Sequence, residues 1–320
     1  MAIENITEGW SRKIYLELTP PSPEDNVSDQ ERIRRALREE YGEVGCSLQV
    51  LRKLYPLCSQ ADWKITVLLV WNGKSWELTD IEPGNTTGEH YGICVDLGST
   101  TLAGELVDMN TGKVLCQKSV FNHQIAYGDD ILTRIFYGKD DPKKLEEIRQ
   151  ATVDSFLELF EKMEQDTGIS GKQCASMVIA GNTTMIHFLF GLDAFCVFSS
   201  PYAVRTLKPD CYRAKDMGFP LKGYVYCYPG QANYLGGDIL SGIAETEIYK
   251  QEELSVFLDI GTNGELVIGN KDFLVAGAGA AGPALEGGVV KTGMRAEPGA
   301  VDRVHIENGQ VNIHVIGETE

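Results

Sequence analysis

The sequence carries one short pattern twice, and this repetition constrains the fold more than any other feature. An apolar run ends in Asp, a glycine turn with Ser or Thr follows, and a second strand-like run returns, at 93–108 (ICVDLGSTTLAGELVD) and at 256–270 (VFLDIGTNGELVIGN). Such an internal duplication predicts two related halves, each built on a β-hairpin. The equivalent positions are Asp96 and Asp259, Gly98 and Gly261, and Ser99 and Thr262.

Each predicted turn suits a phosphate group. A glycine lets successive backbone N–H groups face one anion, and hydroxyls add further donors. A carboxylate repels phosphate, so Asp96 and Asp259 are expected to hold Mg²⁺ through water or to polarise an attacking water. Two such hairpins would clamp a nucleotide triphosphate. Glu265 is a third catalytic candidate that would orient a water; a solvated strand residue is the alternative for it.

Two further segments join the predicted nucleotide site through a resemblance to the superfamily of acetate and sugar kinases, heat-shock chaperone ATPases and actin. Asn182 and Thr183 lie at a strand-to-helix turn, where a helix N-cap and a phosphate contact are both open interpretations. Gly236, Gly237 and Asp238 open a helix just before the second hairpin. The predicted nucleotide-binding residues are therefore Gly98, Ser99, Thr100, Thr101, Asn182, Thr183, Gly236, Gly237, Asp238, Gly261, Thr262, Asn263 and Gly264.

The chain divides near residue 90, where EPGNTTGEH forms a run of turn-forming residues. Residues 1–90 are predicted to form a small α+β domain. In it, Ser28 begins a helix with a capping box, 47–54 forms a second helix, and Asn72-Gly73 joins strands 64–71 and 76–81.

Beyond this boundary, residues 91–320 read as a larger α/β domain, with a first half at 91–250 and the start of a second at 251–320. Three antiparallel strands in series are expected after Tyr91, then a long helix at 143–166. The proline-rich stretch 196–230 is expected to be irregular.

Composition excludes several classes of protein. The chain of 320 residues has a net charge of −17 and shows no basic patch, which argues against nucleic acid and against an anionic membrane surface. No run of about 18 apolar residues predicts a membrane span, and no apolar signal core opens the chain, so a cytoplasmic location is expected. The eight cysteines form no CxxC pair, so no iron–sulfur cluster is expected in this chain.

The duplicated hairpin resembles the phosphate-binding hairpins of the superfamily of acetate and sugar kinases, heat-shock chaperone ATPases and actin. A more specific resemblance rests on a series of motifs: VDLGSTT, NHQIAYGDDILTRI, AGNTTMIHFLFG, YLGGDILSGI, FLDIGTNGELVIG and GAAGPALEGG. In this order they resemble the reductive activators of corrinoid proteins. The resemblance implies a ribonuclease H-like, actin-type ATPase fold, truncated and preceded by the small domain.

The resemblance also implies a function: ATP-dependent return of a corrinoid cofactor from Co(II) to Co(I), with ATP and Mg²⁺ as cofactors and a corrinoid (iron–sulfur) protein as partner. Such activators carry an iron–sulfur electron-donor domain, which is expected to be missing here. The second half is also short, so the chain is expected to be a fragment or a truncated form.

Alternatives remain open at this stage. A small-molecule kinase would need a general base near the 181–184 turn, which reads GNTT without an acid. A non-enzymatic actin-like module would assemble in a nucleotide-dependent way. The oligomeric state, with a homodimer as one option, is not decided by the sequence.

Overall fold

The computed structural model describes residues 9–261, 263–280, 291–294, 297–307 and 309–317. The chain divides into two compact units, Met1–Ser241 and Gly242–Glu320, and each is considered by itself. Among the described residues, no helix combines the length and apolar character needed to cross a bilayer.

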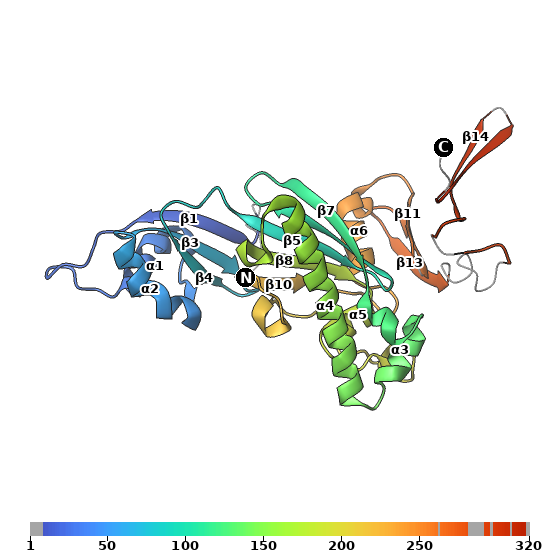
Figure 1. The fold of residues 1–320 in the computed structure, drawn as a ribbon, viewed down its shortest axis with the longest axis horizontal. Helices are drawn as coiled ribbons and strands as arrows, with labels where there is room; N and C mark the ends of the chain where they lie inside the picture. The colour runs from blue at the N-terminus through green and yellow to red at the C-terminus, as the bar shows by residue number, and fades with distance from the viewer. Residues whose placement is uncertain (1–8, 262, 281–290, 295–296, 308, 318–320) are drawn as a thin grey trace. The chain divides into compact units, whose positions relative to one another are not determined.

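The first unit begins with a four-stranded sheet that carries two helices (Figure 1). The strand order is β1-β3-β4-β2, antiparallel except for the short β2, which runs parallel to β4. The elements are β1 (Ser11–Glu17), α1 (Asp29–Tyr41), β2 (Gly45–Cys46), α2 (Leu48–Gln60), β3 (Lys64–Trp71) and β4 (Trp76–Pro83).

Strand β3 is buried on both faces. Its side chains alternate, as the period of two in a strand requires. Ile65, Val67 and Leu69 join the core beneath α1 and α2. Leu68 and Val70 face the other way, into a second cluster with Ala175 and Tyr224 of the next sheet; both clusters lie within the first unit. One strand therefore contributes to two cores.

The two helices begin at the serines that the sequence indicates. The side chain of Ser28 accepts a hydrogen bond from the backbone N–H of Glu31, which satisfies a donor at the start of α1. Ser47 does the same for α2 through the N–H of Val50. Helix α2 is longer than predicted and runs on to Gln60 with Pro56 inside it, because its apolar face continues as far as Cys58 in the core.

The rest of the first unit is a six-stranded sheet of order β7-β6-β5-β8-β10-β9. Its elements are β5 (Tyr91–Leu97), β6 (Thr101–Asp108), β7 (Lys113–Phe121), η1 (His123–Tyr127), α3 (Ile131–Gly138), α4 (Pro142–Thr167), η2 (Gly171–Gln173), β8 (Cys174–Gly181), α5 (Thr183–Leu189), η3 (Phe195–Val197), β9 (Tyr212–Arg213), η4 (Ala214–Met217), β10 (Tyr224–Cys227) and α6 (Gly237–Thr246). The predicted series of three antiparallel strands is present as β5, β6 and β7.

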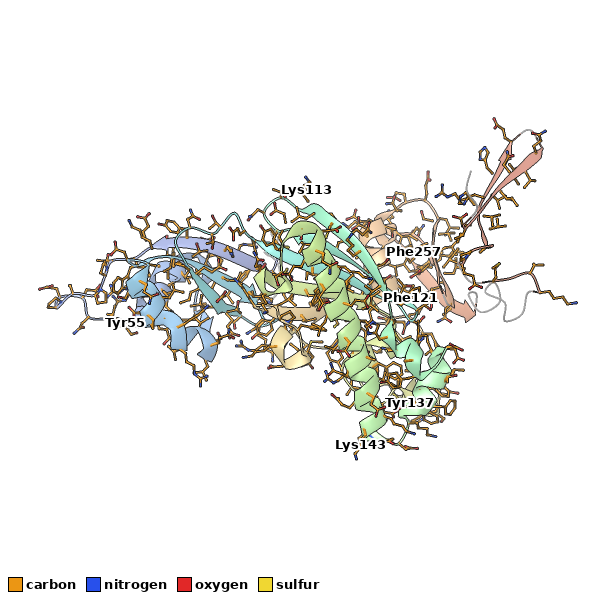
Figure 2. The ribbon with its side chains drawn as sticks, viewed as in Figure 1. Tyr55, Lys113, Phe121, Tyr137, Lys143 and Phe257 are labelled. Carbon is orange, nitrogen blue, oxygen red and sulfur yellow. The ribbon has the colours of Figure 1, made fainter. Side chains whose placement is uncertain are left out.

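The long helix α4 crosses one face of this sheet (Figure 1 and Figure 2). Its buried residues, among them Phe156, Leu159 and Met163, pack with Ile93, Val95 and other sheet residues in one continuous core. This packing fixes the strand ends that carry the candidate site.

The expectation that residues 196–230 are irregular is wrong in part. The stretch contains η3, β9, η4 and β10. Val225 and Cys227 of β10 pair in parallel with Met177 and Ile179 of β8. Only four residues long and placed among prolines, β10 forms because β8 already offers it an edge within the core.

The second unit contains the end of α6, η5 (Ile248–Lys250) and two small sheets. One is an antiparallel sheet of β11 (Ser255–Ile260), β12 (Asn263–Gly269) and β13 (Leu274–Ala280). The other is the hairpin of β14 (Val301–Glu307) and β15 (Gln310–Val315). The repeated sequence pattern therefore forms an antiparallel hairpin in each unit: β5–β6 in the first and β11–β12 in the second.

Candidate functional site

Three parallel strands of the first unit bring the predicted motifs to one edge of the sheet. Strand β8 lies between β5 and β10 and runs parallel to both. Leu97 at the end of β5 is paired with Gly181 at the end of β8, and the Tyr228 N–H after β10 bonds to the Ile179 carbonyl oxygen at 2.8 Å. Ligands of open α/β sheets bind outside the carboxyl ends of parallel strands. The candidate site of this unit is therefore formed by the loops that follow β5, β8 and β10.

The loop after β5 is the predicted phosphate turn. Asp96 lies opposite Ala103 in the hairpin and is exposed near the end of the strand. A Cβ on Gly98 would come within 2.5 Å of the Thr101 carbonyl oxygen, so the turn requires glycine there. Ser99 is buried, whereas Thr100 and Thr101 are exposed.

The turn after β8 confirms the N-cap interpretation of Asn182. Its side-chain oxygen accepts a hydrogen bond from the Met185 N–H at 3.0 Å at the start of α5. The buried Thr183 donates its hydroxyl to the Ala232 carbonyl oxygen at 3.0 Å, which ties this turn to the loop before α6. A direct contact of either residue with phosphate stays a prediction.

The loop after β10 reaches the same place through two glycines at the start of α6. A Cβ on Gly236 would lie 2.4 Å from the Asn182 Cα, and one on Gly237 would lie 2.6 Å from the Tyr228 carbonyl oxygen. These two glycines therefore allow α6 to approach the ends of β8 and β10. Asp238, at the first turn of α6, is half-buried. Beside them lies a cavity of about 10 Å³, room for one water.

The second predicted turn lies in the other unit. Asp259 is directly opposite Glu265 across the β11–β12 hairpin, and Glu265 is 7% exposed. The Gly261 N–H bonds to the Asn263 carbonyl oxygen at 2.8 Å. Gly264 is paired with Ile260, and Thr262 lies outside the described residues. Two carboxyl groups therefore share one face of this hairpin, an arrangement that favours a nearby cation.

The carboxylates at these turns suit a Mg²⁺ ion that is held through water, as predicted from the sequence. Within the described ranges, no group of three or more His, Cys, Asp or Glu side chains is placed to hold a metal ion. Mg²⁺ usually keeps several waters and binds through one or two carboxylates together with substrate phosphates. Asp96 and the Asp259–Glu265 pair offer that kind of donor.

Sequence reasoning missed the residues behind the first turn. The buried side chains of Asn122 and Arg134 donate hydrogen bonds to the carbonyl oxygens of Gly98 and Ser99, at 2.9 and 2.6 Å. Both belong to the segment NHQIAYGDDILTRI, which contributed to the family resemblance without a role for either residue. The sequence offers one signal for this role: both side chains are polar hydrogen-bond donors in a segment that also contains apolar residues.

The sheet order, the strand-end turns and the duplicated hairpin define an actin-like ATPase-type fold preceded by a small α+β domain. The chain belongs to the RACo family. Residues 9–88 match the RACo linker region, residues 91–251 the RACo middle region, and residues 253–320 the C-terminal domain of RACo, the ASKHA domain.

Relatives and a solved structure agree with this assignment. The chain is 34% identical over 236 residues to the corrinoid activation enzyme RamQ of Eubacterium limosum, covering 72% of this chain and 39% of RamQ. It is 26% identical over 244 residues to the [Co(II) methylated amine-specific corrinoid protein] reductase of Methanosarcina barkeri, covering 71% and 43%. A solved reductive activator for corrinoid, iron–sulfur protein aligns with a TM-score of 0.84 at 35% identity, covering 99% of this chain and 51% of that one. The chain thus spans about half the length of these relatives or less.

Proposed function

We propose that this chain provides the nucleotide-dependent part of the reductive activation of a corrinoid protein, in which Co(II) takes up one electron and becomes Co(I). The observation that carries the proposal is the convergence of the loops after β5, β8 and β10 at one sheet edge in a chain of the RACo family. The names of the relatives, which describe corrinoid activation and reduction, support the choice of substrate.

In this proposal the first turn binds the phosphates of ATP. Its backbone N–H groups and the hydroxyls of Thr100 and Thr101 act as donors, while the tight packing of Gly236 against Asn182 keeps the neighbouring loops in register. The second turn, around Asp259, is the other phosphate-binding turn of the proposal. Bound Mg²⁺ would offset the phosphate charge, with Asp96 and Asp259 as the residues that hold its waters.

The coupling of ATP binding to electron transfer follows from thermodynamic linkage. A ligand shifts a conformational equilibrium only through its different affinities for the two states. ATP must therefore favour an arrangement of the activator in which the bound corrinoid is easier to reduce. The electron comes from an iron–sulfur donor, and the corrinoid protein is the partner on which the arrangement acts.

The first test measures binding. The chain is titrated calorimetrically with Mg²⁺ and a non-hydrolysable ATP analogue, alone and with a corrinoid iron–sulfur protein. Saturable binding of the analogue supports the nucleotide site, and its absence in both titrations would count against it.

The second test measures the reaction. The corrinoid protein is held at Co(II) with a reductant too weak to form Co(I), and the Co(I) absorption is followed after ATP is added. Asp96→Asn should lower the ATP-dependent rate at least tenfold, because the carboxylate that holds the Mg²⁺ waters is lost. Asp272→Asn, at an exposed turn between β12 and β13, is the matched control and should keep the rate. Equal rates in the two variants would remove Asp96 from the site.

A further inference from the structure

Three consecutive carbonyl groups of the first turn are tied to one segment of the chain. The Gly98 oxygen accepts from the Asn122 side chain at 2.9 Å, and the Ser99 oxygen from Arg134 Nη1 at 2.6 Å. The Thr100 oxygen accepts from the Asn122 backbone N–H at 2.8 Å. All three donors lie in the stretch that leaves β7 and enters α3.

Arg134 is an unusual residue for this position. It lies on α3, is only 1% exposed, and bonds through Nε to the Gly128 carbonyl oxygen at 2.8 Å. Its hydrogen-bonded partners are neutral oxygens, and the charges of Asp130 and Asp129 act on it from the start of α3. An arginine side chain stays charged in proteins, so a cation is buried directly behind the turn. Burying a charge is costly unless it is paired and hydrogen-bonded, and the bonds to the Gly128 and Ser99 carbonyl oxygens offset part of that cost.

Other residues of the segment between β7 and α3 are also held by hydrogen bonds. The Gln124 side chain donates to the Thr152 hydroxyl at 2.7 Å, and the His123 N–H donates to the Ser155 hydroxyl at 2.9 Å, both on α4. Asp130 caps α3 through the Thr133 N–H at 2.8 Å. The segment that carries the donors to the turn is therefore fixed to the long helix of the core through the neighbouring residues Gln124 and His123.

Peptide geometry gives this arrangement a consequence. In a trans peptide the carbonyl and the following N–H point in opposite directions. Holding the carbonyls of Gly98, Ser99 and Thr100 against one segment turns the next N–H groups away from it. We infer that Arg134 and Asn122 are positioning residues, which orient the N–H groups of Ser99–Thr101 for an anion and hold them rigid before it arrives. Donors that are held in place before binding interact more favourably with the anion, because they need not rearrange when it binds.

The inference rests on the proposed function for the identity of the anion, a nucleotide phosphate, but its structural part is measurable without ligand. Backbone ¹⁵N relaxation of the ligand-free chain gives order parameters for the turn. In the native chain, Ser99–Thr101 should show values of about 0.85, as in rigid backbone. In Arg134→Met they should fall below about 0.6. Arg134→Lys, which keeps the charge but not the planar fork, should fall between the two.

A matched control separates the loss of the hydrogen bonds to the turn from a general loss of stability. Phe219→Leu alters a buried residue that packs against Phe156 and Phe160 of α4 and makes none of the bonds to the turn. It should lower the unfolding midpoint while leaving the order parameters of the turn unchanged. If Arg134→Met does not fold, Arg134→Lys and the same control decide the question.

Nucleotide affinity completes the test. The dissociation constant for the Mg²⁺-bound ATP analogue should rise at least tenfold in Arg134→Met and less in Arg134→Lys, with Phe219→Leu unchanged. Order parameters that stay native in the Arg134 variants, or that fall equally in Phe219→Leu, would overturn the inference. A native chain that binds no nucleotide would instead contradict the proposed function, and the order parameters would still decide the role of Arg134.

Discussion

At the scale of single residues, a buried histidine lies between the small domain and the six-stranded sheet. His90 is 5% exposed, and its Nε2 lies 2.8 Å from the hydroxyl of Ser11 on β1. Burial lowers the pKa of His90 to about 4, and the positive charges of Lys13 and Arg12 act in the same direction. The folded protein therefore holds the neutral imidazole.

This histidine makes stability depend on pH. An unfolded histidine titrates near 6.5, so the folded chain binds fewer protons than the unfolded chain between pH 6.5 and about 4. The stability due to the neutral imidazole is therefore complete above pH 6.5 and is lost as the pH falls towards 4, by up to about 3 kcal/mol. Urea unfolding at a series of pH values measures this loss.

The controls for this prediction are two glutamine variants. His90→Gln should flatten the pH dependence in this range, whereas His305→Gln, at a site 74% exposed in its side chain, should leave it as it is. The same slope in all three proteins would show that other groups cause it.

At the scale of elements, the start of α6 depends on the absence of a side chain at Gly236. An added Cβ would meet backbone atoms of Gly181 and Asn182, at 2.6 and 2.4 Å, and backbone cannot move aside as the end of a flexible side chain can. Gly236→Ala should therefore lower the free energy of unfolding by about 1–3 kcal/mol and weaken nucleotide binding.

Gly88→Ala is the matched change for this prediction, since nothing lies within 4 Å of its added Cβ. It should leave the urea unfolding midpoint near the native value. If Gly236→Ala were as stable as Gly88→Ala, the close approach of α6 would not be required.

Much of the element structure follows from local sequence, because its causes are local. Ser28 and Ser47 cap the helices that follow them, and the apolar strand 64–71 has the predicted bounds. The repeated glycine turn likewise predicts the two hairpins. These signals are read over a few residues, and the structure agrees with them.

The contacts that complete the candidate site could not be predicted in this way. Arg134 and Ser99 are far apart in sequence, and nothing near either residue indicates their hydrogen bond. Strand β10 forms only because β8 lies beside it. Asn182 shows a further limit: a helix cap and a phosphate contact use the same residue type, so the pattern alone does not separate them.

At the scale of the whole first unit, charged residues join the two sheets. Lys222, just before β10, pairs with Asp80 at 2.9 Å and with Glu82, both on β4. Glu77 of β4 accepts a hydrogen bond from the Tyr224 hydroxyl and pairs with Arg213. The pKa of Glu82 falls to about 2 because hydrogen bonds from Lys13 and Lys222 outweigh its burial. The carboxylate of Glu82 therefore stays ionised in the folded protein at neutral pH.

Removing one partner of this cluster should be costly. Lys222→Met would leave two partly buried carboxylates with less positive charge, and the free energy of unfolding should fall by about 3 kcal/mol at pH 7. Lys250→Met removes an exposed pair with Glu247 and should change it by less than about 0.5 kcal/mol. Urea unfolding compares the two; equal midpoints would mean that the cluster contributes no net stability.

Strand β3 has a mechanical consequence. Because β3 packs into both cores, moving the small domain relative to the six-stranded sheet would have to separate closely packed side chains. Helices α1 and α2 pack on the face of β3 that belongs to the first of these cores. We therefore expect a displacement of the six-stranded sheet to carry these two helices with it.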